Sequence, residues 1–295
     1  MASRYIIVNY HYIRPERIRG FHPCTEEHFR EQIAHLRERY TIIPLQELYE
    51  HARDHAEGRF CAFTFDDGLR EHYEFVLPVF LRYGITGSFF PIGMTLEEKR
   101  VSHTHKLHVL LSKMETADIA RLFHDFFEDS YRISDTKRIN PRRRFDDILT
   151  SNLKETLIRL APQKRNAFID DVFKKTGGNE KILAEKLFMT SDEVRRLYEE
   201  GMTIGFHGYC HVPFDVMDAE EQRQDLVHAI QTIVSITGES PDTFSYPNGR
   251  YNEDALLLLR AHQVKIAVIL GAKDVSGSLD PLLLPRYDTN DVFSL

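Results

Sequence analysis

The chain of 295 residues is poor in cysteine and carries no excess of positive charge. Its three cysteines, Cys24, Cys61 and Cys210, are too few and too scattered for a disulfide framework, and they suit a reducing compartment. Acidic residues (45) outnumber basic residues (38), which gives a formal net charge of −7. This balance argues against non-specific binding to nucleic acid or to an anionic membrane surface.

Long apolar runs are also absent. No run approaches the roughly 20 residues of a membrane span, so we expect none. The first 14 residues lack the longer apolar core and the small-residue cleavage site of a signal peptide. We therefore expect a cytoplasmic protein. A hydrophobic content of 42% is typical of a globular chain, long enough here for one large domain or a domain with an insertion.

What the sequence does contain is a short apolar stretch that runs directly into two adjacent carboxylates. Residues 60–65 are typical of a buried strand, and Asp66, Asp67 and Gly68 follow at once. In parallel α/β folds, chemistry sits at the carboxyl ends of strands. Two neighbouring acids are tolerated there if a cation lies between them or if one carboxyl holds a proton. A solvated Asp-Gly turn is the alternative.

Strand and helix signals alternate in the first 95 residues and again after about residue 190. The predicted strands cover residues 5–12, 40–43, 60–65, 85–90, 202–206, 243–246, 264–270 and 282–288. Helix N-caps are indicated at Thr25, Thr190, Asp218 and Asn252. This rhythm implies parallel strands with right-handed crossovers. Only helical patterns occur between the two halves, which we interpret as a helical insertion.

Polar residues follow three of the predicted strands: Asp66 with Asp67, His207 with His211, and residues 247–249. Two histidines four apart can converge on one ion. One aspartate and two histidines make an open three-ligand set for a borderline-soft divalent metal, which leaves the second aspartate free to act as a base. Two unrelated loop histidines are the alternative, and the acidic pair argues against it.

These motifs resemble those of the polysaccharide deacetylase family, which has the NodB-homology fold. Residues 64–68 (Thr-Phe-Asp-Asp-Gly) resemble its first motif, residues 207–211 (His-Gly-Tyr-Cys-His) its second, and residues 244–249, more loosely, its third. The resemblance covers roughly residues 1–95 and 190–295. It implies an α/β protein, an irregular (β/α) barrel, as a single domain over residues 1–295 with the helical insertion at about 96–189.

The resemblance also implies roles for individual residues. Asp67, His207 and His211 would hold a divalent metal, often zinc in this family. Asp66 would be the general base. The backbone N–H of Asn248 would stabilise an oxyanion, a donor that acts on charge developing in the transition state.

Two positions depart from the family pattern. Ser245 stands where the third motif usually has an arginine that orients the base, and Arg286 is the substitute candidate. The late Leu-x-x-His-Asp motif that supplies a histidine acid is missing. In some members of the family, the strand that carries this histidine comes first in the chain and has a Tyr-His pair. Tyr10-His11 fits this arrangement. We therefore interpret His11 as the general acid.

The implied activity is removal of an N-acyl group, the acetyl group in our interpretation, from an amino sugar. The substrate would belong to a cell-surface polysaccharide such as lipopolysaccharide, or to its precursor. A cytoplasmic nucleotide- or lipid-linked amino sugar is favoured over an exported polymer because no signal peptide is evident. A deformylase or another C–N amide hydrolase of the same fold is one alternative, and a non-catalytic sugar-binding relative is another. The sequence leaves the oligomeric state open.

Overall fold

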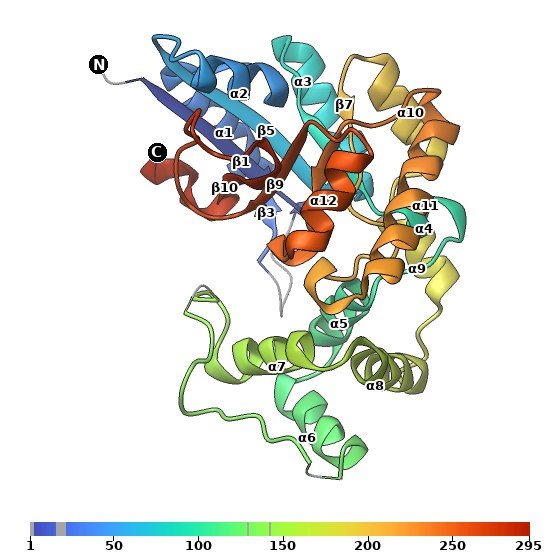
Figure 1. The fold of residues 1–295 in the computed structure, drawn as a ribbon. Coiled ribbons are helices and arrows are strands. Elements are labelled where there is room, and N and C mark those ends of the chain that lie inside the picture. Colours follow the sequence, from blue (N-terminus) through green and yellow to red (C-terminus); the bar gives the residue numbers. More distant parts are fainter. Residues whose placement is uncertain (1–2, 16–21, 129, 142) are drawn as a thin grey trace. The chain divides into compact units, whose positions relative to one another are not determined.

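The computed structural model describes residues 3–15, 22–128, 130–141 and 143–295 (Figure 1). The chain divides into two compact units. Unit 1 comprises Met1–Pro15, Cys24–Arg100 and Ala184–Leu295, and unit 2 comprises Glu16–Pro23 and Val101–Leu183. The single domain expected over residues 1–295 stays a prediction.

Unit 1 contains a parallel sheet that curves into a nearly closed barrel. Its strands are β1 (Arg4–Tyr10), β4 (Thr41–Ile42), β5 (Arg59–Asp67), β6 (Ser88–Pro91), β7 (Thr203–Ile204), β8 (Thr243–Ser245), β9 (Ile266–Leu270) and β10 (Leu284–Asp288). Seven of them follow the order β7-β6-β5-β1-β10-β9-β8, in which neighbours are parallel, and β4 pairs with β5. A parallel bridge between Phe206 and Phe244 joins the two ends of this order. The predicted irregular (β/α) barrel is therefore confirmed.

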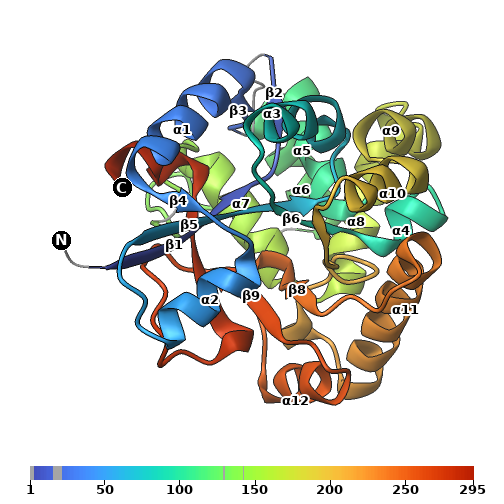
Figure 2. The same cartoon turned by 90° about the horizontal axis from the view of Figure 1, so that it is seen from above.

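Helices cover the outside of this barrel, as the view in Figure 2 shows for α1, α3, α10, α11 and α12. The helices of unit 1 are α1 (Glu26–Arg39), α2 (Leu45–Arg53), α3 (Leu77–Tyr83), α4 (Gly93–Glu97), α10 (Ser191–Glu199), α11 (Ala219–Thr237) and α12 (Glu253–Ala261). Shorter elements are the π-helix η1 (His72–Val76) and the 3-10 helices η2 (Phe214–Val216), η3 (Pro247–Gly249), η4 (Pro281–Leu283) and η5 (Thr289–Ser294). Two short strands, β2 (Ile13–Arg14) and β3 (Cys24–Thr25), form a separate pair.

Local sequence signals set the helix starts. The side chains of Thr25, Thr190, Asp218 and Asn252 accept hydrogen bonds from backbone N–H groups of the first helical turn, and two of these caps are complete capping boxes. All four predicted N-caps are confirmed.

Strand starts are less local. Residues 85–87 were expected to extend β6, yet β6 begins at Ser88. The N–H of Ile85 instead donates to the carbonyl of Phe80 and closes the end of α3, where Gly84 is left-handed. The N–H of Ile85, which would be needed to extend the strand, is therefore already used at the end of α3.

Side-chain alternation along the strands decides where the core ends and the polar region begins. In three strands, a residue of one buried apolar cluster is followed two positions later by a buried polar residue. These are Ile7 and Asn9 in β1, Ala62 and Thr64 in β5, and Leu284 and Arg286 in β10. Because every second side chain shares a face, this face changes from apolar to polar toward the carboxyl ends of the strands.

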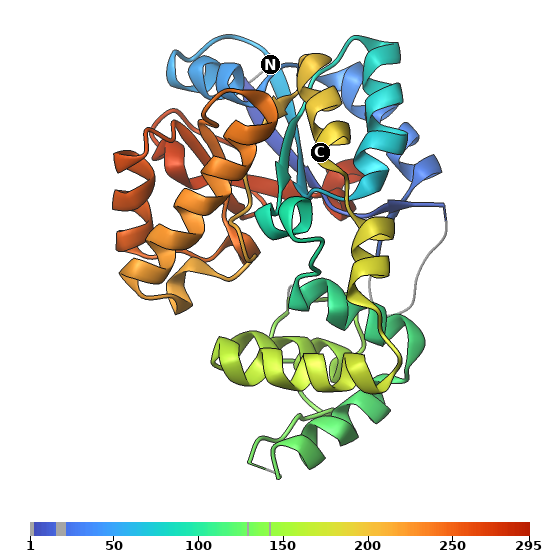
Figure 3. The ribbon, with the colours of Figure 1, turned by 90° about the vertical axis from the view of Figure 1, so that its right-hand side faces the viewer.

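Unit 2 is built from helices that pack on one another, drawn in green to yellow-green in Figure 3. They are α5 (His103–Lys113), α6 (Thr116–Phe126), α7 (Ile148–Arg159) and α8 (Pro162–Lys175), and α9 (Glu180–Leu187) runs from unit 2 into unit 1. The unit has its own apolar core, which includes Leu110, Phe123, Leu153, Leu157 and Phe168. In the part of the chain that the structure describes, no helix has the length and apolar character to cross a membrane.

Candidate active site

Asp67, His207 and His211 come together where β5 and β7 end. Their candidate ligand atoms lie within 4.8 Å of one another, and all three residues are buried. Asp67 Oδ1 is 3.6 Å from His207 Nε2 and 3.3 Å from His211 Nε2. The three residues predicted to bind metal therefore form one compact cluster.

The environment of His207 fixes which ring nitrogen faces the cluster. Nδ1 lies 2.6 Å from the carbonyl oxygen of Ser245, so Nδ1 carries the proton and donates it. Burial lowers the pKa of His207, although the charge of Asp66 works in the opposite direction. A neutral ring with a protonated Nδ1 presents the lone pair of Nε2 toward Asp67, which is the form that binds a metal.

The other two residues of the cluster, Asp67 and His211, have left-handed backbone conformations. Asp67 has φ 75° and His211 has φ 56°, in a region that non-glycine residues adopt only at a cost of about 1–3 kcal/mol. Gly68 follows with φ 70°, and a Cβ at this glycine would lie 2.7 Å from Pro91 Cβ. The chain thus turns sharply after β5 at a position that only glycine can occupy without displacing β6.

Asp66 lies beside the cluster in a buried ion pair with Arg286. Arg286 Nη1 donates to Asp66 Oδ1 over 2.9 Å and Nη2 donates to Oδ2 over 2.7 Å. Burial would raise the pKa of Asp66, but the guanidinium of Arg286 holds it well below its usual range. Asp66 is therefore held as a carboxylate. This is the contact that the interpretation of Arg286 as the orienting arginine requires.

Arg286 also binds residues from three other strands. It donates to Asn9 Oδ1 over 2.8 Å, to Ser245 Oγ over 3.1 Å and to Thr64 Oγ1 over 3.3 Å. Asn9 in turn donates to Asp66 Oδ2 over 3.2 Å. Since the planar guanidinium offers its donors in a fixed fork, these contacts hold the carboxylate in one orientation.

His11 follows β1 and approaches the same carboxylate. Its Nε2 lies 3.7 Å from Asp66 Oδ2, and its side chain is 39% exposed. The backbone carbonyl of His11 accepts a hydrogen bond of 2.8 Å from Nε2 of His72, which lies at the start of the π-helix η1. The structure thus brings His11 to Asp66, and its role as general acid stays a prediction.

Asn248 lies in η3, directly after β8. It is half-buried and adopts a left-handed conformation, with φ 56° and ψ 15°. The following Gly249 is also left-handed, and a Cβ there would lie 2.8 Å from the backbone nitrogen of Leu270. The role of the Asn248 backbone N–H as an oxyanion donor stays a prediction.

Three residues that contribute to the site escaped the sequence analysis. Asn9 binds the side chain of Asp66, and His72 binds the backbone of His11. Asp225 accepts two N–H groups of the segment between His207 and His211. Asn9 occupies an alternate position of β1, where a buried polar residue among apolar ones was a usable signal. His72 and Asp225 lie within helical patterns, where only the tertiary fold reveals their contacts.

The donor set fits a divalent transition metal. One carboxylate oxygen and two imidazole nitrogens suit borderline-soft ions such as Zn²⁺, and three protein ligands leave a coordination position open for a reactant. The neutral, correctly oriented ring of His207 supports this fit. The structure therefore supports a divalent metal at Asp67, His207 and His211.

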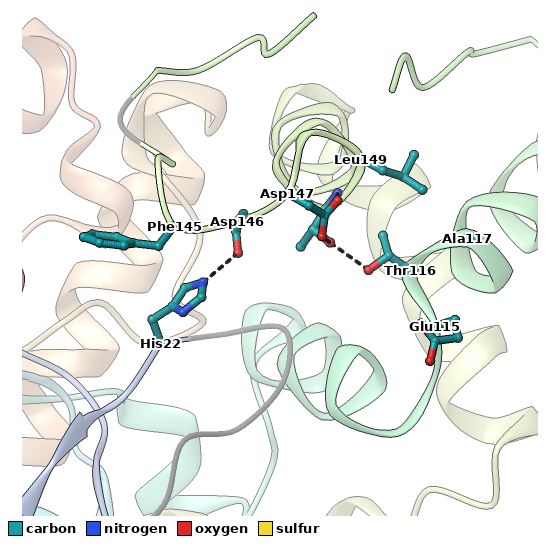
Figure 4. A pocket seen from close by; sticks show the side chains of 9 residues that line it. His22, Glu115, Thr116, Ala117, Phe145, Asp146, Asp147 and Leu149 are labelled. Atoms are coloured by element: carbon teal, nitrogen blue, oxygen red, sulfur yellow. Dashed lines mark hydrogen bonds and ion pairs between the residues drawn. The ribbon is translucent and has the colours of Figure 1, made fainter. Parts of the chain in front are cut away.

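Unit 2 contains a separate cavity of about 350 Å³ (Figure 4). It is lined by His22, Glu115, Thr116, Ala117, Phe145, Asp146, Asp147, Leu149 and Thr150. Asp146 is engaged by Lys154 at 2.8 Å and by His22 at 3.4 Å, and Asp147 caps α7. Because these carboxylates already serve the packing of unit 2, we place the candidate site at the barrel.

Two solved structures share the fold over nearly the whole chain. The deacetylase PplD of Streptococcus pyogenes, solved in complex with acetate, has a TM-score of 0.61 and 13% identity, covering 100% of this chain and 98% of that one. A de-N-acetylase from Aggregatibacter actinomycetemcomitans has a TM-score of 0.57 and 14% identity, covering 97% and 95%. At this level of identity the likeness establishes the fold.

A family model described as polysaccharide deacetylase matches residues 144–267, a segment that contains His207, His211 and Asn248. This match covers less than half of the chain, and over that segment the chain is similar to polysaccharide deacetylases. A peptidoglycan deacetylase-like protein of Gibberella zeae is 33% identical over 67 residues, or 23% of this chain. That match spans only 20% of the length of the curated relative.

Proposed function

We propose that this chain is a member of the polysaccharide deacetylase family and a metal-dependent hydrolase that removes an N-acetyl group from an amino sugar. The observation that carries the proposal is the buried cluster of Asp67, His207 and His211 beside the ion pair of Asp66 and Arg286. The first set is suited to holding Zn²⁺, and the second keeps a carboxylate ionised within the same site.

Each residue has a distinct part in the proposed reaction. When bound, the divalent ion supplies Lewis-acid chemistry, because it polarises a carbonyl and lowers the pKa of water. Asp66, held as a carboxylate by Arg286, accepts the proton of the attacking water. The N–H of Asn248 stabilises the negative charge that develops on the acyl oxygen. His11 donates a proton to the departing amine, so that the C–N bond breaks to give a neutral amine.

The proposed substrate is an amino sugar linked to a nucleotide or a lipid, or present in an oligosaccharide. We also propose that the protein works in a reducing, cytoplasmic compartment. All three cysteines are free thiols, and burial raises the pKa of Cys24 to about 11. Fractionation of cells with an antibody to the chain tests the location, and its recovery outside the cytoplasm would rule this part out.

The function is tested by measuring acyl release from a panel of amino sugars. The Zn²⁺-loaded protein is incubated with N-acetylated and N-formylated sugars, each as an oligosaccharide and as a nucleotide-linked monomer, and acetate and formate are quantified. A variant with both His207→Ala and His211→Ala serves as the control. Acetate release by the wild type alone supports the proposal. Formate release without acetate would favour a deformylase, and sugar binding without any release would favour a non-catalytic relative.

A further inference from the structure

The segment from His207 to His211 is a loop between β7 and α11, and it does not adopt helical geometry. Gly208 has φ 71° and His211 has φ 56°, so the backbone turns twice into the left-handed region within four residues. Two histidines four apart on a helix would face the same side without help. On a loop, their relative placement depends on whatever holds the backbone between them.

Asp225 holds that backbone from one side. It lies in α11 and is only 8% exposed. Its Oδ1 accepts the N–H of Tyr209 over 2.8 Å, and its Oδ2 accepts the N–H of Cys210 over 2.8 Å. Each oxygen of one buried carboxylate is thus matched to one of two successive amides, an arrangement of charge-assisted hydrogen bonds.

The other side of the loop is held by the start of α4. The carbonyls of Gly208 and Tyr209 accept the N–H groups of Gly93 and Met94 over 3.1 and 3.0 Å. The fit is close, because a Cβ at Gly208 would lie 2.8 Å from Asp225 Oδ1 and a Cβ at Gly93 would lie 2.5 Å from Tyr209 Cδ2. Backbone donors and acceptors of the loop are therefore both paired within unit 1.

We propose that Asp225 is a positioning residue that fixes the loop between His207 and His211 in its metal-binding shape before any metal arrives. This inference rests on the metal site of the proposed function, and it requires no particular substrate. Preorganisation of this kind raises metal affinity because the ion does not have to order its own ligands. Residues that orient metal ligands typically contribute about 10- to 100-fold in affinity.

The change Asp225→Asn separates this role from simple packing. Asparagine keeps the size of the side chain and one acceptor oxygen, but its NH₂ group would face a backbone N–H, so donor meets donor. The bond to one amide is lost and the negative charge is removed. Asp218→Asn is the matched control, because Asp218 lies at the start of the same helix and accepts the N–H groups of Glu220 and Glu221.

Affinity for Zn²⁺ is measured by competition with a chromophoric chelator, and the thermal midpoint of the zinc-free protein is measured in parallel. We expect Asp225→Asn to weaken Zn²⁺ binding by about tenfold or more, and Asp218→Asn to leave it unchanged. A loss of less than roughly threefold in folded Asp225→Asn would overturn the proposal. Neither readout involves hydrolysis, so a protein that binds zinc and deacetylates nothing still gives a clear answer.

A second measurement needs no variant, should Asp225→Asn fail to fold. Cys210 is exposed to solvent, and its amide would exchange quickly if the loop were held only by metal. We expect the amides of Tyr209 and Cys210 to be protected from hydrogen exchange in zinc-free wild-type protein, and to the same degree after Zn²⁺ is added. Free exchange without zinc, followed by protection with zinc, would show that the metal orders the loop and would refute the proposal.

Discussion

Arg286 donates two parallel hydrogen bonds to Asp66, although the two residues are 220 positions apart in the chain. Both side chains are almost fully buried, at 1% and 2% exposure. Leaving one partner of such a pair alone in the interior costs about 3–5 kcal/mol. The pair therefore orients the carboxylate and also ties β5 to β10.

Changing Arg286 to lysine tests the two-bond geometry. Lysine keeps the charge but cannot present two parallel donors, so Asp66 should lose its fixed orientation. We expect Arg286→Lys to retain metal and to lower kcat about 100-fold, the effect of misplacing a reacting group by about 1 Å. Steady-state kinetics and metal analysis check this.

The control is Arg4→Lys. Arg4 binds both oxygens of Asp274 over 2.8 and 3.0 Å, and its side chain is 29% exposed. Its replacement should leave kcat close to the wild-type value. Equal effects of the two changes would mean that Arg286 matters only for stability.

Asp66→Asn tests the proposed base. The side chain keeps its size, but it can no longer take up a proton, and general base catalysis is worth ~10²–10⁴-fold. We expect metal content to stay at the wild-type level while turnover falls by that factor. Asp274→Asn, which alters the carboxylate bound by Arg4, is the control. Near wild-type turnover in Asp66→Asn would remove the base role.

His11→Ala tests the proposed acid by comparing leaving groups. A poor amine leaving group needs protonation as the C–N bond breaks, whereas an activated ester hardly does. Turnover of an N-acetyl sugar should therefore fall much further than turnover of an acetyl ester with a good leaving group, and metal content should not change. His28→Ala on α1 is the control. Equal losses on both substrates would contradict the acid role.

His72 gives a prediction about stability and pH. Burial lowers its pKa from 6.5 to about 4 in the folded protein, although the His11 carbonyl works in the opposite direction. Between these two values the unfolded chain binds a proton that the folded chain does not. The free energy of unfolding should therefore decrease as the pH falls from about 6.5 toward 4, by at most about 1.4 kcal/mol per pH unit from this group.

His72→Gln isolates this effect, since the glutamine amide can still donate to the carbonyl of His11 but does not titrate. Urea unfolding of metal-free protein at several pH values between 4.5 and 7 gives the slope of the free energy of unfolding against pH for the wild type and for the variant. We expect the variant to lose less stability than the wild type as the pH falls. Parallel slopes would mean that His72 is not the buried neutral group that the structure indicates.

The sequence predicted best what depends on neighbouring residues. The capping boxes of Thr190 with Glu193 and of Asp218 with Glu221 are complete within four positions, and both are present. The strand that ends in Asp66 and Asp67 was also evident, because an apolar run meets an acidic pair there. The end of α3 was harder, since the use of the Ile85 N–H depends on how Gly84 closes the helix.

Contacts between distant elements were predicted only where a motif pointed to them. The proximity of His207 and His211 to Asp67 followed from the family motifs, and Arg286 followed from a missing arginine at Ser245. Asn9 and Asp225 belong to no such motif. Their neighbours are set by strand register and by the packing of α11, which a single sequence does not encode in its local pattern.

Titration of Zn²⁺ into metal-free protein, with acetate release from an N-acetylated amino sugar as the readout, tests the central claim most directly. We predict that activity is absent without metal, rises in proportion to added Zn²⁺ and reaches its plateau at one ion per chain. The variant with His207→Ala and His211→Ala should bind no zinc at this site and stay inactive. Activity that is independent of added metal, or that survives in the double variant, would contradict the assignment of Asp67, His207 and His211 as the metal centre.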